Sequence, residues 1–332
     1  MPEMNRMWKL ASRPHGRAKP GDFRLEEAPL RPLVAGEFRI RNQWLSVDPY
    51  MRGRMDDARS YVPPQPLGEV MQGGAVGEVV ESRNERFATG SVVIGDFGWQ
   101  LYAISDGRGV RKVPNTRIPL STYLGCVGMP GTTAWYGLRC IIKPRPGETV
   151  VVSAASGAVG SVVGQLATRA GARAVGIAGG PAKCRAVVEE FGFDACIDYK
   201  TPGFADRLAA ATPRRVDGSF ENVGGAVWDV VLARMNAFGR VALCGLISGY
   251  DAELPPLRNY RSILTNRLRV QGFIVSEHIA EWREAPAELA DLVERGELRY
   301  RESVSQGIES VPGAFLGLFS GANFGKQVVK LI

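Results

Sequence analysis

The stretch Thr149-Val-Val-Val-Ser-Ala-Ala-Ser-Gly-Ala-Val-Gly160 places an apolar strand directly before a turn of small residues. Gly157 and Gly160 occupy the second and third positions of the dinucleotide-binding fingerprint, and Ala155 stands at the first. Apolar residues then recur with helical spacing, and Gly171 stands where a C-terminal cap is expected. We predict a strand-turn-helix unit whose backbone N–H groups face a pyrophosphate, because the positive end of the helix dipole favours an anion. The alternative is a glycine-rich packing turn that binds no ligand.

Further along the chain, strand-like and helix-like segments alternate, which is typical of a parallel sheet covered by helices on both faces. The expected strands are Thr149–Ser153, Ala174–Ile177, Ala195–Asp198, Gly218–Glu221, Arg240–Cys244 and Leu268–Phe273. Six such strands make a complete Rossmann sheet, so we predict an α/β fold with a doubly wound parallel sheet. A helix is expected over Ile279–Glu294, ended by Gly296. The segment before Gly125 is rich in Pro and Gly with short extended runs, which predicts a β-rich, barrel-like domain.

The composition favours a globular protein with more than one domain. The chain has 332 residues and an apolar content of 45%. No apolar run approaches the roughly 20 residues that span a bilayer, so we expect a soluble cytoplasmic protein. The net charge is +7, but Lys and Arg are scattered, so we expect neither a nucleic-acid nor a membrane partner. Reduced core thiols best explain the five cysteines, Cys126, Cys140, Cys184, Cys196 and Cys244.

The end of the second expected strand indicates which nicotinamide cofactor binds. Sites that prefer NAD carry an acid there, which accepts hydrogen bonds from the ribose hydroxyls. This chain has Ala178-Gly179-Gly180, followed by Lys183 and Arg185. Because a cation suits a ribose 2′-phosphate, we predict NADPH. A solvated helix lysine is the alternative for Lys183, and Tyr199 either rests against the adenosine ribose or caps the sheet edge.

A zinc-assisted reaction needs protein ligands drawn from cysteine, histidine and carboxylates. The chain has only two histidines, His15 and His278, and its cysteines are not closely spaced. We therefore expect no metal. His15 lies in a Pro/Gly/Arg-rich stretch, and a helix-entry or surface role is the expectation for His278.

Six motifs in order along the chain resemble one family. They are Asp48-Pro-Tyr-Met-Arg-Gly53, Gly128-Met-Pro-Gly-Thr-Thr-Ala134, Ala154–Gly160, Ala178-Gly-Gly-Pro-Ala-Lys-Cys184, Glu221-Asn-Val-Gly-Gly225 and Gly321-Ala-Asn-Phe-Gly-Lys326. The family is the zinc-free group of medium-chain dehydrogenases/reductases that contains prostaglandin reductase, 2-alkenal reductase and curcumin reductase. The resemblance implies a GroES-like domain over 1–125, a Rossmann NADPH-binding domain over 126–296, and strands over 297–332 that return to the first domain. It also implies a homodimer.

The same resemblance implies cofactor contacts, residue by residue. Ser156, Gly157, Ala158 and Val159 would contact the pyrophosphate, Gly179, Lys183 and Tyr199 the 2′-phosphate side, and Asn222 the adenosine half. Cys244, Gly245, Ile247, Ser248 and Tyr250 would wall the cofactor, while Met129 and Thr133 would border the nicotinamide. Phe273, Ile274 and Val275 would present backbone near the nicotinamide amide, and Asn323 and Gly325 would close the site from the tail. Ordinary core packing is the alternative for the apolar members, above all for Cys244.

Hydride transfer without a metal needs an electron-poor acceptor, such as the β-carbon of an α,β-unsaturated aldehyde or ketone. Negative charge then builds on the carbonyl oxygen, where a hydrogen-bond donor stabilises it. Tyr50 is the candidate donor, because it follows an Asp-Pro turn and a phenol stays protonated at neutral pH. Surface packing is the alternative for Tyr50, and the cofactor's ribose hydroxyl or water could relay the proton. Other functions that the sequence leaves open are a quinone reductase and a non-enzymatic cofactor- or nucleic-acid-binding protein.

The sequence departs from its relatives at two places. Some relatives carry a tyrosine that aligns with Thr265, and Tyr260 lies five residues earlier. The acid role of that tyrosine is therefore open in this chain. Plant relatives also carry an aromatic residue where Gly74 stands, which predicts a wider substrate pocket.

Overall fold

The structure is a computed structural model that describes residues 3–114, 117–253 and 255–332. The chain forms two compact units. Unit 1 comprises Met1–Leu124, Glu302–Asn323 and Gln327–Ile332, and unit 2 comprises Gly125–Arg301 and Phe324–Lys326. Residues 297–301 and 324–326 thus group with unit 2, whereas the sequence suggested one returning segment over 297–332.

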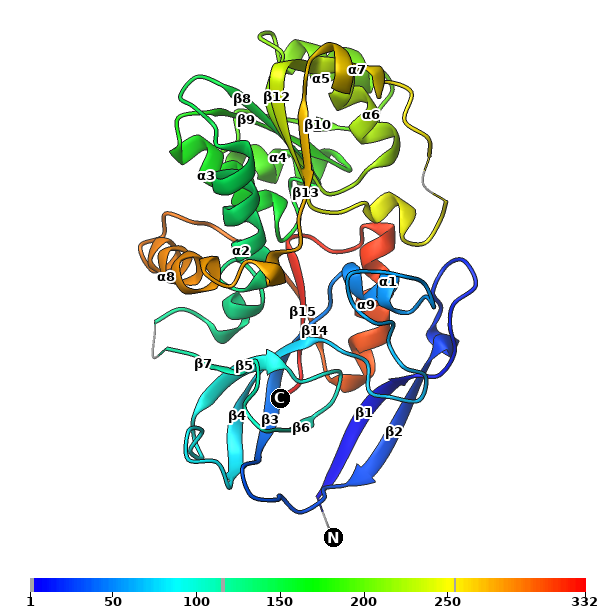
Figure 1. The fold of residues 1–332 in the computed structure, drawn as a ribbon, viewed down its shortest axis with the longest axis vertical. Helices are drawn as coiled ribbons and strands as arrows, with labels where there is room; N and C mark the ends of the chain where they lie inside the picture. The colour runs from blue at the N-terminus through cyan, green and yellow to red at the C-terminus, as the bar shows by residue number, and fades with distance from the viewer. Residues whose placement is uncertain (1–2, 115–116, 254) are drawn as a thin grey trace. The chain divides into compact units, whose positions relative to one another are not determined.

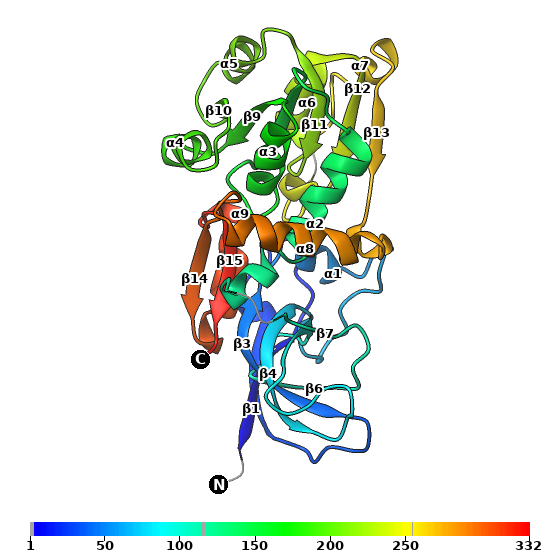
Figure 2. The same cartoon turned by 90° about the vertical axis from the view of Figure 1, so that its left-hand side faces the viewer.

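Unit 2 is built on a six-stranded parallel sheet, which confirms the predicted fold class (Figures 1 and 2). Its strands are β8 (Thr149–Ser153), β9 (Arg173–Ala178), β10 (Ala195–Asp198), β11 (Val216–Glu221), β12 (Met235–Leu243) and β13 (Arg269–Gly272). Their order is β10-β9-β8-β11-β12-β13. Val150, Val151 and Val152 are fully buried, because both faces of a parallel sheet are covered.

Helices cover both faces of this sheet. The helices of unit 2 are α2 (Met129–Tyr136), α3 (Gly160–Arg169), α4 (Pro181–Glu189), α5 (Phe204–Ala211), α6 (Gly225–Arg234), α7 (Arg261–Thr265) and α8 (Glu281–Glu294). Of these, α8 packs on α2 and α7 packs on α6. α5 and α6 pack on the face that carries Val151 and Ile177, and α4 packs near Gly176 on the other. Gly171 and Gly296 have φ angles of 78° and 69°, so both helix ends use the left-handed region that glycine favours.

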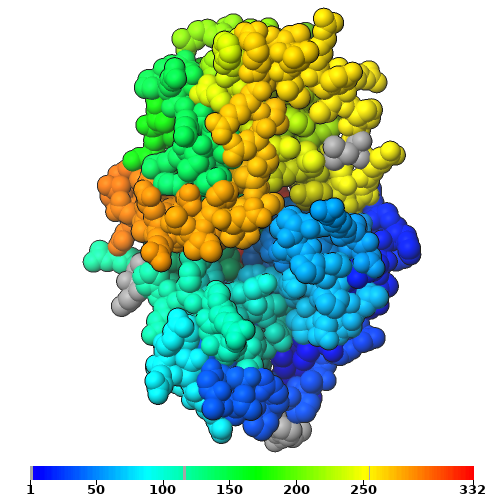
Figure 3. All heavy atoms as spheres, in the orientation of Figure 1, coloured from blue at the N-terminus to red at the C-terminus, as the bar shows by residue number. Residues whose placement is uncertain are grey.

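The strand order of the sheet reverses between β8 and β11. In open parallel sheets, ligands bind beyond the carboxyl ends of the strands at such a switch point. The residues that follow Ser153 and Glu221 therefore lie at the edge where a nucleotide is expected. At the far side of the sheet, β13 is an edge strand, and Figure 3 shows this segment, in gold, at the surface of unit 2.

Unit 1 is mainly antiparallel. Its strands are β1 (Met4–Leu10), β2 (Phe23–Pro29), β3 (Phe38–Ser46), β4 (Gly74–Ser82), β5 (Val92–Asp96), β6 (Tyr102–Ser105), β7 (Arg111–Lys112), β14 (Glu302–Gln306) and β15 (Lys326–Lys330), with helices α1 (Tyr50–Arg54) and α9 (Val311–Ser320). β1 and β2 form a two-stranded sheet, and the others form a seven-stranded sheet. The tail strand β15 pairs with β3, with Val328 opposite Ser46.

No helix among the described residues is long and apolar enough to span a bilayer.

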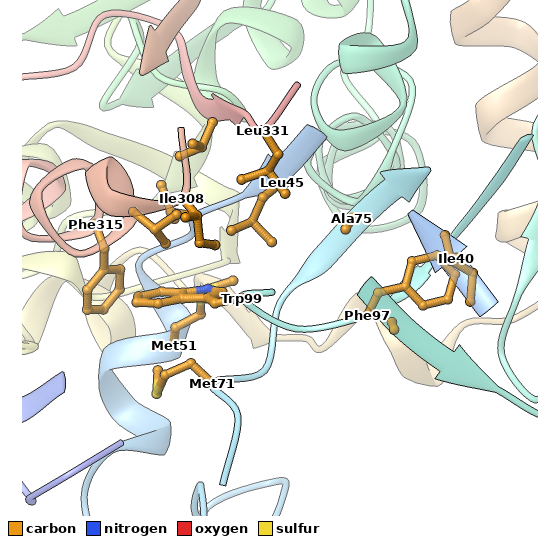
Figure 4. Close-up of a cluster of buried hydrophobic side chains, with 14 of the residues drawn as sticks. Ile40, Leu45, Met51, Met71, Ala75, Phe97, Trp99, Ile308, Phe315 and Leu331 are labelled. Carbon is orange, nitrogen blue, oxygen red and sulfur yellow. The ribbon is translucent and has the colours of Figure 1, made fainter. Parts of the chain in front are cut away.

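The core of unit 1 holds the short helix α1 in place. Trp99 is fully buried, and its ring centroid lies 5.4 Å from that of Phe23 and 5.3 Å from that of Phe315. Met51 is buried within the same cluster (Figure 4). Because Met51 is anchored in this core, the backbone position of its neighbour Tyr50 is fixed.

Candidate functional site

The turn after β8 has the backbone geometry of a phosphate-binding loop. Ala154 has a φ angle of 49°, and its carbonyl accepts a hydrogen bond from the Gly157 N–H at 2.9 Å. A Cβ atom at Gly160 would lie 2.4 Å from the Ala154 oxygen, so only glycine allows this helix to begin so close to the turn. The third glycine of the motif is therefore explained by close packing between helix and strand.

The N-terminus of α3 leaves hydrogen-bond donors available. No side chain caps this helix, and within the described part of the chain the N–H groups of Ala158 and Val159 have no hydrogen-bond partner. Both residues are partly exposed, as is Gly157, while Ser156 is buried. Free N–H groups at a helix N-terminus form an anion site. Two of the four residues predicted to contact the pyrophosphate thus have N–H groups that could serve as donors.

A segment of the C-terminal tail lies against this turn. The Gly325 N–H donates to the Ser156 carbonyl at 2.9 Å, and Gly325 forms an isolated parallel bridge with Gly157. Gly325 has a φ angle of 73°, and a Cβ atom there would lie 1.9 Å from the Arg301 oxygen. Gly325 therefore lies beside the phosphate loop, with a backbone conformation and a close contact that favour glycine. It follows Asn323, the other predicted tail contact, by two residues.

Two lysines follow the ends of β9 and β10. Burial lowers the pKa of Lys183, and the positive charge of Lys200 adds to this shift. A Cβ atom at Gly179 would lie 3.0 Å from the Lys200 Cε and 3.1 Å from a Tyr199 ring carbon. The structure therefore places Tyr199 and Lys200 against Gly179, four residues before Lys183. The sequence analysis did not select Lys200. Two neighbouring cations beside an aromatic ring suit a dianionic phosphate.

The Asp198 carboxylate lies close to Gly180 and Lys200, and it accepts hydrogen bonds from their backbone N–H groups. Asp198 Oδ1 accepts hydrogen bonds from the N–H groups of Gly180 at 2.9 Å and Lys200 at 3.0 Å. Oδ2 accepts one from the Thr201 hydroxyl at 3.1 Å. These hydrogen bonds lower the pKa of Asp198, the Gly180 bond most of all. Asp198 therefore shapes the turn that presents Gly179 and Lys200.

The segment after β12 packs along the residues that follow β11. The N–H groups of Cys244 and Gly245 donate to the Glu221 carbonyl at 2.9 and 3.1 Å. In the same way, Ile247 donates to the Asn222 carbonyl at 3.2 Å, and Ser248 donates to the Val223 carbonyl at 3.0 Å. Tyr250 follows this segment, and its hydroxyl would lie 3.4 Å from a Cβ atom at Gly245. The residues predicted to wall the cofactor thus form one continuous surface with Asn222.

A buried acid lies beneath that surface. Glu221 Oε1 accepts hydrogen bonds from the N–H groups of Val223 and Gly224, both at 2.7 Å, and from the Ser153 hydroxyl at 2.9 Å. Among the described residues, Oε2 has no hydrogen-bond partner. Burial raises the pKa of Glu221 to about 7, although the hydrogen bonds to Oε1 oppose the shift. Burial, together with the charge of Glu221, raises the pKa of the Cys244 thiol to about 12.

The residues predicted near the nicotinamide lie on α2 and after β13. Thr133 is buried, and its hydroxyl donates to the Met129 carbonyl at 2.7 Å. The Phe273 ring centroid lies 5.4 Å from that of Tyr136. Further on, the Ile274 carbonyl accepts the Glu277 N–H at 3.1 Å, and the buried Val275 accepts the Trp282 indole N–H at 3.0 Å. His278 stacks on Tyr136 with ring centroids 3.9 Å apart, so this histidine has a packing partner.

In unit 1, Tyr50 begins α1 and is half-buried. The Arg54 guanidinium lies over its ring, 4.6 Å from the centroid. Burial raises the pKa of Tyr50, and so do the charges of Asp48 and Asp96, while Arg54 lowers it. Its hydroxyl is therefore protonated at neutral pH, and it makes no hydrogen bond within the part of unit 1 that the structure describes. Among the described residues, the Tyr50 hydroxyl is thus a donor with no hydrogen-bond acceptor.

The structure also shows where Tyr260 and Gly74 lie, the two residues discussed above where the sequence departs from its relatives. Tyr260 is 66% exposed and caps α7, which precedes β13 and so lies at the amino edge of the sheet, away from the switch-point edge. Tyr250, not Tyr260, is the tyrosine of unit 2 that follows the carboxyl end of a central strand. In unit 1, a Cβ atom at Gly74 would approach only Leu124 and Ser46, at 3.8 and 4.0 Å. Gly74 therefore leaves room for a side chain.

Comparisons with known proteins cover both units. Residues 6–113 match the N-terminal domain of oxidoreductase, and residues 158–291 match a family described as zinc-binding dehydrogenase. The chain is 44% identical to the NADPH-dependent curcumin reductase of Escherichia coli, over 99% of this chain and 97% of the relative. It is 38% identical to the NADP⁺-dependent 2-alkenal reductase of Nicotiana tabacum, over 95% and 94%. The crystal structure of CurA from Vibrio vulnificus in complex with NADPH superposes with a TM-score of 0.94, at 42% identity, covering 98% of this chain and 99% of that one.

The residues of this chain do not fit the zinc that one family description mentions. Within residues 3–114, 117–253 and 255–332, no three His, Cys, Asp or Glu side chains are grouped so that they could hold a metal ion. His278 packs face to face on Tyr136. The reaction proposed below therefore uses no metal ion.

Proposed function

This chain belongs to the medium-chain dehydrogenase/reductase family, in its group of NADP-dependent curcumin and 2-alkenal reductases, and we propose that it reduces the carbon–carbon double bond of α,β-unsaturated aldehydes and ketones with NADPH. The observation that carries the proposal is the position of Tyr199 and Lys200 against Gly179, beside the helix that bears Lys183 and at the edge of a Rossmann sheet where the Ala158 and Val159 N–H groups, among the described residues, have no hydrogen-bond partner. The names of the relatives support the double bond as the group that is reduced.

In this proposal the residues of unit 2 hold the cofactor. The N–H groups of Ala158 and Val159 bind the pyrophosphate, with Gly157 and Ser156 completing the turn. Lys183 and Lys200 bind the 2′-phosphate, and Tyr199 lies against the adenosine. The surface formed by Asn222 and the segment 244–250 contacts the rest of the dinucleotide, with Met129, Thr133 and the segment 273–275 toward the nicotinamide. From the tail, Gly325 of unit 2 closes the site, and Asn323, which groups with unit 1, is the remaining predicted contact.

Bound NADPH supplies a hydride to the β-carbon of the substrate. Tyr50 then donates a hydrogen bond to the carbonyl oxygen, where negative charge builds during the reaction. Because the pKa of Tyr50 is raised, the phenol keeps its proton and acts as a hydrogen-bond donor rather than as a strong acid. The α-carbon can therefore take its proton from water or from the ribose hydroxyl of the cofactor.

We expect purified protein to oxidise NADPH with trans-2-hexenal but not with hexanal. The conjugated double bond makes the β-carbon electron-poor, whereas reduction of a saturated aldehyde needs stronger polarisation of its carbonyl. The measurement is the loss of NADPH absorbance, with product identified by mass spectrometry. Equal rates with both aldehydes would contradict the double-bond assignment. Activity confined to a quinone would make the protein a quinone reductase, and no activity with any acceptor would favour a non-enzymatic role.

We expect Tyr50→Phe to lower kcat with the enal by about tenfold, the value of one neutral hydrogen bond of roughly 1.4 kcal/mol. The KM for NADPH should change little, because the ring and its packing remain. Tyr102→Phe is the matched control, since the Tyr102 hydroxyl donates to Glu3 elsewhere in unit 1. Unchanged kcat in Tyr50→Phe would remove this hydroxyl from the reaction.

The chain is also proposed to form a homodimer. β13 is an edge strand of a parallel sheet, and its Val270 is only half-buried. Nearby, Phe238 is 67% exposed and Leu264 is 79% exposed. Exposed edges and apolar patches of this kind are commonly covered by a partner.

We expect light scattering to give twice the chain mass of 36.0 kDa. The double variant Phe238→Ser/Leu264→Ser should shift the protein toward the monomer, because it removes apolar surface from the proposed contact. Val34→Ser, at an exposed residue of unit 1, is the control. A monomeric native protein would exclude the proposed dimer.

A further inference from the structure

Hydrogen bonds join the ends of β8 and β11 at the switch point of the sheet. Ser153, the last residue of β8, is buried, and its hydroxyl donates to Glu221 Oε1 at 2.9 Å, with the Phe220 carbonyl as a longer second acceptor at 3.4 Å. The same hydroxyl oxygen accepts the Asn222 N–H at 2.8 Å. In return, Asn222 Nδ2 donates to the Ser153 carbonyl at 2.8 Å. Ser153 and Asn222 are therefore held together at two points, and one of them includes the buried acid.

These contacts decide which way the Asn222 amide points. Because a carbonyl can only accept, the Asn222 side-chain atom that faces Ser153 is the nitrogen, and the oxygen Oδ1 is turned away from it. Asn222 is partly exposed, and within the described part of the chain Oδ1 has no hydrogen-bond partner. The backbone of Asn222 is also held, since its carbonyl accepts the Ile247 N–H at 3.2 Å. Oδ1 is thus available to accept a hydrogen bond from a ligand.

Glu221 ties the Ser153 hydroxyl to the turn on the other side of Asn222. Its side chain is fully buried, and Oε1 also accepts the N–H groups of Val223 and Gly224, each at 2.7 Å. Three donors therefore converge on one oxygen atom. If the Ser153 hydroxyl or the turn rotated away, a buried polar group would lose its partner. The acid thus fixes the backbone and the hydroxyl that together hold the Asn222 amide.

We propose that Glu221 is a positioning residue for the cofactor: through the Ser153 hydroxyl and the turn 222–224, it holds the Asn222 amide so that Oδ1 accepts a hydrogen bond from a ribose hydroxyl of the dinucleotide. This inference rests on the proposed function. Oδ1 needs a donor, which excludes the phosphate groups of the cofactor. Asn222 is bonded to Ser153, which directly precedes the turn proposed to bind the pyrophosphate. The sugars attached to the pyrophosphate are therefore the donors nearest to it.

The first test is a double-mutant cycle on cofactor affinity. Dissociation constants for NADPH and NADH are measured by fluorescence titration for native protein, Ser153→Ala, Asn222→Ala and the double variant. Each single variant should weaken the binding of both cofactors about tenfold, as for the loss of one hydrogen bond. The double variant should bind no more weakly than Asn222→Ala alone, because Ser153 acts through Asn222. Additive losses would overturn the proposal.

The second test compares two replacements of the acid. Glu221→Gln keeps an oxygen for the Ser153 hydroxyl and the two N–H groups, so it should retain both native affinities within about twofold. Glu221→Ala removes that oxygen and should weaken both cofactors about tenfold. Native affinities in Glu221→Ala would contradict the positioning role. If Glu221→Ala does not fold, the cycle on Ser153 decides.

A matched control separates positioning from a general loss of stability. Thr212 is fully buried at the end of α5, and its hydroxyl donates to the Leu208 carbonyl at 2.6 Å. Thr212→Val should lower Tm, as Ser153→Ala should, but it should leave both dissociation constants unchanged. All titrations are made well below the Tm of each variant. Equal weakening of cofactor binding in Thr212→Val and Ser153→Ala would mean that Ser153 acts only through stability.

The two cofactors distinguish this proposal from the proposed function. A lost ribose contact weakens NADPH and NADH alike, whereas a lost contact to the 2′-phosphate weakens NADPH alone. If Lys183→Ala lowers the affinity for NADPH while Ser153→Ala changes neither affinity, the positioning role is wrong and the proposed function stands. A native protein that binds neither cofactor would overturn both proposals.

Discussion

Replacing Lys183 and Lys200 together by alanine weakens NADPH binding about 100-fold and leaves NADH binding nearly unchanged, since hydrogen bonds to charged groups contribute roughly 1.5–3 kcal/mol each. Burial lowers the pKa of Lys183, and repulsion from the charge of Lys200 lowers it further. A 2′-phosphate bound by both lysines would offset that repulsion and add two charge-assisted contacts. NADH lacks this phosphate, so its affinity should not depend on either side chain.

The measurement is the dissociation constant of each cofactor for the two single variants and the double variant. Each single variant should lose about tenfold, and the NADPH contacts should weaken as salt is added. Arg169→Ala is the matched control, because Arg169 lies at the opposite end of α3 and pairs with Glu297. A double variant that still prefers NADPH by the native factor would show that other cations hold the phosphate.

Glu221→Gln changes how the stability of the protein depends on pH. In the folded protein the pKa of Glu221 is raised to about 7 from its ordinary value of 4.5, so the folded state holds the proton more tightly than the unfolded state. The contribution of Glu221 to the free energy of unfolding is therefore complete below pH 4.5 and is lost as the pH rises through 7. The loss amounts to about 3 kcal/mol, since one pKa unit corresponds to about 1.4 kcal/mol.

Thermal unfolding of native protein and Glu221→Gln between pH 5 and pH 8 checks this expectation. Glutamine keeps the oxygen that accepts the N–H groups of Val223 and Gly224 but carries no titrating proton. The variant should gain stability relative to the native protein as pH rises, with the gain largest above pH 7. Glu189→Gln, an exposed carboxylate on α4, is the control. Parallel curves for native protein and Glu221→Gln would mean that Glu221 is ionised at no cost.

The Rossmann sheet could be predicted from sequence because its strands are buried on both faces and read as short apolar runs. β8 and β10 have the predicted bounds. β12 begins at Met235 rather than Arg240, because Asn236 and the exposed Phe238 interrupt the apolar pattern. The antiparallel strands of unit 1 gave weaker signals, since alternate residues face solvent and several strands are short.

The site could be predicted where one continuous segment supplies all the groups that would contact the ligand, as in the turn around Gly157. Lys200 was missed because it follows the third strand, whereas the search for a 2′-phosphate cation began at the end of the second. Its only signal in the sequence is its position beside Tyr199. Glu221 was quoted within a motif without a role, because a buried acid at a strand end cannot be told from an exposed one until its neighbours are known. The cofactor contacts, Tyr50 and the cytoplasmic location stay predictions.

The tail segment Phe324–Lys326 belongs to unit 2, while the residues on either side of it belong to unit 1. A fragment that ends at Arg301 would therefore lack Gly325, whose N–H holds the Ser156 carbonyl. Expressing the nucleotide-binding half on its own thus exposes the back of its phosphate loop to water. A peptide that carries the missing tail would have to be supplied in trans to restore it.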